Sequence, residues 1–167
     1  MIARGYFGIG VYQPKTKVNV GVLWRSASVL GAAFLFTIGH RYQHQCSDTM
    51  KSFRHIPLFS YDSFDAFYSQ MPRLGRLVGV EIDEQAQAIQ PFIHPQQAVY
   101  LLGAEDHGPP QKVIDKCWAV VQLPGERCMN VSVAGSIVMF DRVNKQDLTS
   151  REIARATKIW NAECPTL

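Results

Sequence analysis

Short apolar runs alternate with helix-type segments along this chain, and this alternation most constrains its fold. The runs Ala32–Ile38, Ala98–Leu102 and Trp118–Leu123 are almost continuously apolar, as is typical of strands covered on both faces. Asn19–Leu30 has apolar residues at helical spacing, and a further helix is expected at about Val131–Val143. The pattern predicts an α/β domain with a mostly parallel, twisted sheet and helices on both faces.

The remaining elements follow from shorter signals. Gly5–Tyr12, Ile56–Tyr61 and Arg76–Glu81 read as strands. Short helices are expected after Asp62 and at Gln111–Cys117, and a last helix at Ser150–Trp160. The polar segment Gly39–Arg54 reads as a long surface loop. In open α/β sheets, ligands bind beyond the carboxyl ends of the strands, so those ends are where a site is expected.

Length and composition suit a globular protein. The chain has 167 residues, enough for one domain with one core, and we expect a single domain over residues 1–167. Hydrophobic residues make up 47% and charged residues 19%, which excludes a disordered chain. No apolar stretch reaches the ~18–20 residues of a membrane span, and residues 1–5 lack the layout of a signal peptide. We therefore expect a cytoplasmic protein without a membrane anchor.

The formal charge of +3 is unevenly distributed. Residues 1–60 contain seven Lys or Arg and one acid, a net charge of +6, whereas residues 61–110 contain two basic residues and seven acids, a net charge of −5. The last 57 residues contain eight basic and six acidic residues, a net charge of +2. A basic first third would attract a polyanion. An unevenly charged, solvated surface explains the same numbers, so charge alone leaves both interpretations open.

A metal site is not expected from the cysteines and histidines. The four cysteines are Cys46, Cys117, Cys128 and Cys164. None forms a Cys-x-x-Cys pair, so reduced, partly buried thiols are the simplest interpretation. The run His40–Cys46 has no spacing that suits a closed four-ligand site.

The first stretch with possible chemistry is Asn19–Ala27. Asn19 and Arg25 are six residues apart, just under two helical turns. Arginine is a fixed cation whose planar donor fork suits phosphate. Taken alone, Asn19 is a good helix cap and Arg25 a solvated surface residue.

Two further stretches follow predicted strands. In Tyr100–Pro110, Gly103 ends a strand and would let a ligand approach the backbone closely, with Glu105 just beyond it. In Val121–Ser136, a strand is followed by a proline loop and a helix start at Asn130, with small residues that permit close packing. Alone, the first is a tight turn with solvated acids and the second a capped helix N-terminus.

Together and in this order, the three stretches resemble the motifs of the SpoU/TrmH branch of the SPOUT RNA methyltransferases. Motif one has an Asn followed six residues later by an Arg, as in Asn19 and Arg25. Motif two is Gly-x-Glu-x-x-Gly, matched by residues 103–108. Motif three is Ser-Leu-Asn-Val-Ser-x-Ala, matched by residues 128–134 with Cys128 in place of the serine. The resemblance covers nearly the whole chain.

The resemblance implies a deep trefoil knot in the C-terminal half, with S-adenosylmethionine bound in the knot largely by backbone groups. No metal and no added RNA-binding domain are implied. The cofactor-binding positions carried over to this chain are Leu102, Gly103, Leu123, Met129 and Val131.

The implied reaction is methylation of a ribose 2′-hydroxyl of tRNA or rRNA. Arg25 would act near the target phosphate and hydroxyl, while Asn19, Glu105 and Asn130 would orient the substrate. The family usually forms homodimers, with Arg25 reaching the partner's cofactor site. Two alternatives stay open: an RNA base methyltransferase, and a non-catalytic RNA-binding protein that keeps the fold, for which Cys128 is the best support.

Overall fold

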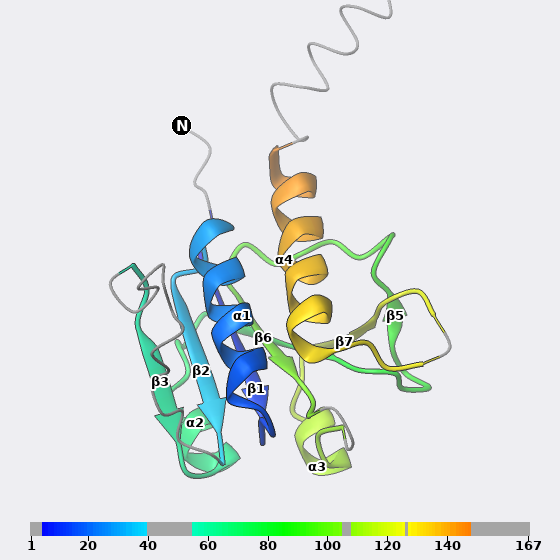
Figure 1. Ribbon diagram of the computed structural model, residues 1–167. Helices are drawn as coiled ribbons and strands as arrows, with labels where there is room; N and C mark the ends of the chain where they lie inside the picture. The colour runs from blue at the N-terminus through cyan, green and yellow to red at the C-terminus, as the bar shows by residue number, and fades with distance from the viewer. Residues whose placement is uncertain (1–4, 40–54, 105–107, 126, 148–167) are drawn as a thin grey trace, which may run out of the picture.

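The computed structural model describes residues 5–39, 55–104, 108–125 and 127–147 (Figure 1). The strands within these ranges are β1 (Phe7–Tyr12), β2 (Phe34–Ile38), β3 (Leu58–Tyr61), β4 (Arg76–Val80), β5 (Gln87–Ala88), β6 (Ala98–Leu102) and β7 (Ala119–Gln122). The helices are α1 (Lys17–Val29), α2 (Phe64–Gln70), α3 (Gln111–Ile114) and α4 (Val131–Asp147). The strands form one sheet in the order β3-β2-β1-β6-β4-β7-β5, and its paired strands are parallel.

Both faces of the sheet are covered, as the continuous apolar runs predict. Successive side chains of a strand point to opposite faces, so Tyr100 packs with the core beneath α1 and α4 while Leu101 packs with α2 and α3. On the second face, Phe67 of α2 stacks on Phe36 of β2 with ring centroids 4.4 Å apart. The predicted α/β class with a mostly parallel sheet and helices on both faces is confirmed.

Helices α1 and α4 lie side by side on the first face and approach each other closely (Figure 1). A Cβ added at Gly135 of α4 would lie 2.4 Å from a methyl carbon of Leu23 in α1. The hydroxyls of Ser26 and Ser136 are 2.9 Å apart across the same contact. The small residues of the third stretch therefore permit the close packing that the sequence predicts.

Two predictions about the elements need correction, and one short strand was not predicted. Asn19 does not cap α1, because the helix begins at Lys17 with Thr16, another favoured capping residue type, at the N-cap position. Helix α4 runs to Asp147, four residues beyond the predicted end. The two-residue strand β5 was not predicted because its residues are polar or small and exposed.

Some expectations fall on residues outside the described ranges. These are most of the Gly39–Arg54 loop and the helix at Ser150–Trp160. The trefoil knot also stays a prediction, because residues 105–107 and 126 belong to the loops that would form it. Among the described residues, no helix is both long and apolar enough to cross a membrane.

The C-terminal half of α4 is held by a buried arginine. The Arg142 side chain is fully buried and donates hydrogen bonds to the carbonyl oxygens of Pro95 (2.6 Å) and Gln96 (2.8 Å) and to the hydroxyl of Tyr100 (3.1 Å). Its guanidinium carbon also lies 5.0 Å from the centre of the Phe7 ring. One side chain thus joins α4 to β1, to β6 and to the segment that precedes β6.

A network of polar side chains next to Arg142 also holds α4 in place. Asp141 lies 2.8 Å from Nε2 of His94 and 2.6 Å from Nζ of Lys145, and Nδ1 of His94 lies 2.6 Å from the Tyr100 hydroxyl. Lys145 also donates to the carbonyl oxygens of Ile89 and Phe92. Burial lowers the pKa of His94, and the hydrogen bond to Asp141 opposes this effect. These bonds explain why α4 continues past its predicted end.

We expect Arg142→Ala to lower the free energy of unfolding by about 3 kcal/mol or more, because it leaves buried carbonyl and hydroxyl groups without donors and opens a cavity. Arg142→Lys should recover little of this loss, since one ammonium cannot replace the planar fork. Urea denaturation measures the effect. Arg73→Ala is the matched control at an exposed position and should stay within about 0.5 kcal/mol of the wild type. Equal losses in both variants would contradict the anchoring role.

Candidate functional site

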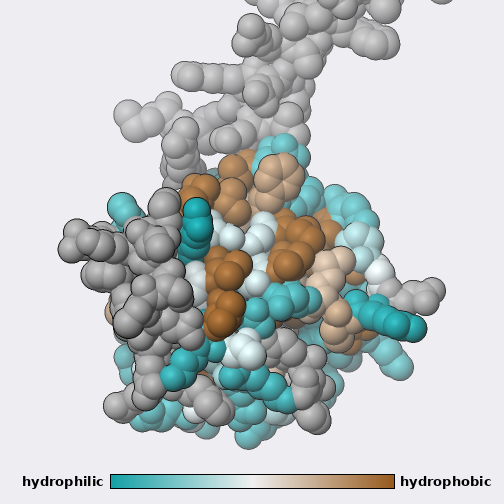
Figure 2. All heavy atoms as spheres, viewed as in Figure 1, coloured by the Kyte–Doolittle hydropathy of each residue, from teal (hydrophilic) through white to brown (hydrophobic). Residues whose placement is uncertain are grey.

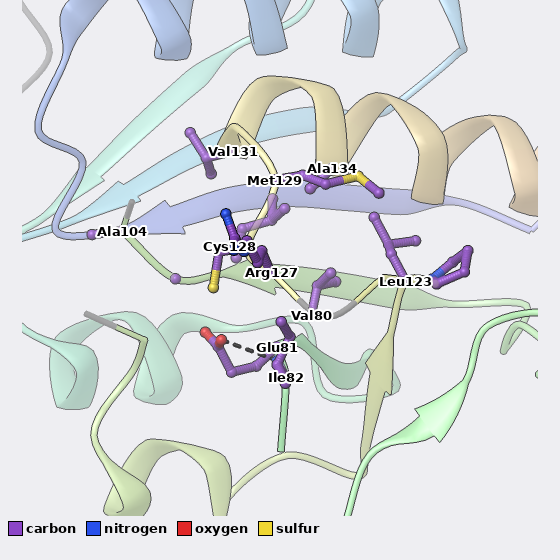
Figure 3. Close-up of a pocket in the computed structure, with 13 residues that line it drawn as sticks. Val80, Glu81, Ile82, Ala104, Leu123, Arg127, Cys128, Met129, Val131 and Ala134 are labelled. Carbon is purple, nitrogen blue, oxygen red and sulfur yellow. Dashed lines mark hydrogen bonds between the residues drawn. The ribbon is translucent and has the colours of Figure 1, made fainter. Parts of the chain in front are cut away.

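A pocket lies at the carboxyl ends of three adjacent strands (Figure 3). Register explains its position, because Val80 of β4 pairs with Leu102 of β6 on one side and Val121 of β7 on the other. The loop before α4 and the first turn of that helix close the pocket. Its lining consists of Val80, Glu81, Ile82, Leu102, Gly103, Ala104, Leu123, Pro124, Arg127, Cys128, Met129, Val131 and Ala134.

All of the residues expected to bind a cofactor line this one pocket: Leu102, Gly103, Leu123, Met129 and Val131. They come from two strand ends, a loop and a helix start. The walls they form are mainly apolar, and the strand ends bring backbone groups to the surface of the pocket. Such a cavity suits a flat, partly apolar ligand that is recognised by main-chain atoms.

Glu81 is an acid that lines this pocket, and its carboxylate lies next to both glycines of the second motif. A Cβ added at Gly103 would lie 2.6 Å from Oε2 of Glu81, and one added at Gly108 would lie 2.5 Å from the same atom. Any larger side chain at either position would therefore collide with the carboxylate. The glycines make room for Glu81 as well as for a ligand.

The environment of Glu81 affects its ionisation. Burial raises the pKa of the Glu81 carboxyl above its ordinary value, and the nearby charge of Asp83 acts in the same direction. The backbone N–H of Ile82 donates to Oε1 at 3.0 Å and opposes the rise in pKa. The carboxylate is thus partly shielded from water.

Asn130 begins α4 and connects it to α1. Its Oδ1 accepts hydrogen bonds from the backbone N–H of Ser132 (2.9 Å) and from the Ser132 hydroxyl (2.7 Å), which is the geometry of a helix cap. Its Nδ2 donates to Oδ1 of Asn19 at 3.0 Å. The two predicted polar residues therefore meet, although 111 positions separate them in the sequence.

Arg25 lies elsewhere. It is exposed on α1 and is not among the residues that line the pocket. Along the helix it shares a face with Val18, Val22 and Val29, all of them exposed. Within one chain, the structure thus brings Asn19 to Asn130 but does not bring Arg25 to the pocket. Glu105, the remaining predicted site residue, lies outside the described residues.

Sequence reasoning missed the role of Glu81 in the pocket. The available signal was an acid placed directly after the apolar run 77–80, at a strand end. Arg127 was missed as well, whereas Cys128 was noted only as a departure from a motif. In the part of the chain that the structure describes, no three His, Cys, Asp or Glu side chains are grouped to hold a metal ion.

The fold and pocket define a parallel α/β protein with a ligand site at the strand ends. The profile of the SpoU rRNA Methylase family matches residues 7–140, which is most of the chain. The chain therefore belongs to this family, and the sequence resemblance is confirmed. A comparison with curated proteins gives no match.

Solved structures share the fold at low sequence identity. The SpoU methyltransferase AviRb from Streptomyces viridochromogenes, in complex with the cofactor AdoMet, has a TM-score of 0.73 and 22% identity; the match covers 87% of this chain and 62% of AviRb. A structure described as giving insights into the 2-OH methylation of C/U34 on tRNA has a TM-score of 0.73 and 23% identity. The match covers 89% of this chain and 100% of that chain. The A. aeolicus TrmH/SpoU tRNA modifying enzyme has a TM-score of 0.75 and 16% identity. The match covers 94% of this chain and 88% of that enzyme. The chain thus spans about six tenths of the length of AviRb.

We expect Asn130→Ala to lower the free energy of unfolding by about 1 kcal/mol, because the cap of α4 and the bond to Asn19 are both lost. Asn130→Asp keeps the capping acceptor and should stay within about 0.5 kcal/mol of the wild type. Thermal or urea unfolding of both variants measures this difference. If the aspartate variant is as unstable as the alanine variant, the donor to Asn19 and not the cap is what stabilises the helix start.

Proposed function

We propose that this protein is an S-adenosylmethionine-dependent RNA methyltransferase that methylates a ribose 2′-hydroxyl of tRNA or rRNA. The observation that carries the proposal is the pocket at the ends of β4, β6 and β7. It collects every position at which the motifs place a cofactor contact. The AdoMet complex of AviRb and the tRNA 2-OH methylation described for another structure of this fold support it. We also propose that the protein acts in the cytoplasm.

The residues of the pocket suit the proposed cofactor. Leu102, Leu123 and Val131 supply apolar surface for an adenine ring, and Gly103 lines the same pocket. When bound, S-adenosylmethionine supplies an electrophilic methyl group on its sulfonium. The protein's own task is to position a hydroxyl in line with that methyl, and orientation of this kind supplies a large part of a rate enhancement.

Arg25 is the residue that we assign to the RNA hydroxyl and phosphate, and its location implies a second copy of the chain. Val18, Val22 and Val29 make the face of α1 around it apolar. On α4, Val133 and Phe140 are exposed beside a shallow groove that Val22 also lines. Figure 2 shows this apolar surface over the two helices. We infer a homodimer in which this face is covered and Arg25 of one copy reaches the pocket of the other.

The proposal predicts cofactor binding and a ribose product. The purified protein should bind S-adenosylmethionine and S-adenosylhomocysteine without added metal, as measured by calorimetry. RNA incubated with it should yield a 2′-O-methylated nucleoside after digestion and mass spectrometry. Mapping 2′-O-methyl sites in cells with and without the gene then identifies the RNA. Absence of binding at ligand concentrations far above micromolar contradicts the cofactor assignment, and a methylated base points to a base methyltransferase.

We expect Arg25→Ala to abolish methyl transfer and to leave S-adenosylmethionine affinity unchanged, because we assign cofactor binding to other residues, namely Leu102, Gly103, Leu123, Met129 and Val131. Arg25→Lys should also be poor, since a point charge cannot reproduce the planar fork. If Arg25 were only a solvated helical residue, the alanine variant would keep wild-type turnover and change stability by under about 0.5 kcal/mol. Single-turnover assays and calorimetry separate the two outcomes.

Mixed dimers test whether Arg25 acts on the partner's pocket. Gly103→Val should close the pocket, because its side chain would collide with Glu81 and Pro109. A heterodimer of Arg25→Ala and Gly103→Val chains, purified with two tags, would then hold one site with both functional parts. It should show about half of wild-type turnover, although each variant alone is inactive. No recovery, or a mass near the 18.8 kDa of one chain in light scattering, would rule out action across the dimer.

A further inference from the structure

Glu81 stands at the centre of the edge of the sheet that carries the pocket. It directly follows Val80, which pairs with β6 on one side and with β7 on the other. Its backbone position is therefore fixed by a strand with neighbours on both sides. Of the side chains that line the pocket in the described part of the chain, it is the only acid.

The carboxylate of Glu81 has acceptor capacity to spare. Oε1 accepts one hydrogen bond, from the N–H of Ile82. Within the described residues, Oε2 receives no hydrogen bond and occupies the space that a Cβ at Gly103 or at Gly108 would need. Two carboxylate oxygens have about four acceptor positions, so most of these stay open for a ligand.

Among the described residues that line the pocket, Glu81 and Arg127 are charged and most of the others are apolar. Figure 3 shows Glu81 across the pocket from Val131 and Met129, with its carboxylate directed away from Leu123. An adenine ring packed against Leu123 and Val131 would leave its ribose, one glycosidic bond away, as the first polar group to meet Glu81. A carboxylate with two oxygens matches the two adjacent hydroxyls of a ribose, and an acid at a strand end binds ribose in this way in dinucleotide-binding folds.

We propose that Glu81 is a specificity-determining residue that accepts hydrogen bonds from the ribose hydroxyls of the bound adenosyl group. This inference rests on the proposed function, because it needs an adenosyl ligand in the pocket. It gives the motif glycines a further role, since they keep the space in which the carboxylate meets the sugar. The amino group of the methionine part is the competing partner for an acid at this place.

The test compares ligands that differ by one group. Calorimetry is performed on the wild type, Glu81→Ala and Glu81→Gln with S-adenosylhomocysteine, its 2′-deoxy derivative and 5′-methylthioadenosine, which lacks the amino acid. The wild type should bind the 2′-deoxy derivative about tenfold or more weakly than S-adenosylhomocysteine, as expected for a lost hydrogen bond to a charged group. Glu81→Ala should bind these two ligands with nearly equal affinity.

Glu81→Ala should also bind S-adenosylhomocysteine and 5′-methylthioadenosine more weakly than the wild type does, and by the same factor for both ligands. If Glu81→Ala loses affinity for S-adenosylhomocysteine alone, the proposal is overturned and Glu81 is assigned to the amino group of the methionine part. Glu81→Gln keeps the shape of the side chain and should retain part of the discrimination. Glu84→Gln is the matched control, because Glu84 is exposed and does not line the pocket, and its affinities should equal those of the wild type.

The remaining outcomes separate the inference from the proposed function. If Glu81 only supports the loop beside it, Glu81→Ala will bind all ligands less well but will discriminate against the 2′-deoxy derivative as the wild type does, which overturns the inference alone. Unchanged affinities in Glu81→Ala also overturn it alone. If the wild type binds none of the ligands, this result contradicts both the proposed function and the inference. Thermal unfolding of each variant without ligand identifies any loss that comes from misfolding.

Discussion

The placement of α4 depends on one buried arginine. Arg142 lies in the core beside Phe7 and Tyr100 and donates hydrogen bonds to the backbone carbonyls of Pro95 and Gln96. A buried charge is costly unless it is hydrogen-bonded, so these acceptors favour the observed position of the helix. Because the first turn of α4 forms a wall of the pocket, an anchor at the far end of the helix sets the geometry of the site.

The pocket itself follows from the order of the strands. Parallel strands present their carboxyl ends at one edge, and the order β6-β4-β7 places three of those ends next to one another. The side chains there are small or apolar, so the polar character of the site comes from the backbone and from a few residues such as Glu81. Asn130 adds the connection to α1, which carries Arg25 on its other face.

Much of the fold could be predicted from the sequence, because strands buried on both faces leave almost continuous apolar runs. The run 98–102 matches β6 to the residue. The helix cap at Asn19 was wrong because Thr16 and Asn19 are both capping residue types, and only the contact with Asn130 decides between them. The pocket positions came from a resemblance and not from periodicity. Glu81 was not predicted as a pocket residue, because Gly103 and Gly108 are distant from it in the sequence and only the fold brings them close.

The position of β1 in the sheet has a consequence for synthesis on the ribosome. This strand is the first made, yet it lies inside the sheet, between β2 and β6. Until residues 98–102 emerge, one edge of β1 has no hydrogen-bonding partner. The apolar side of α1 stays uncovered for longer, because α4 is synthesised later than β6. A nascent chain in this state exposes an open strand edge and an uncovered core, which are the features that promote aggregation. The core is therefore complete only after α4, the last described helix, has left the ribosome.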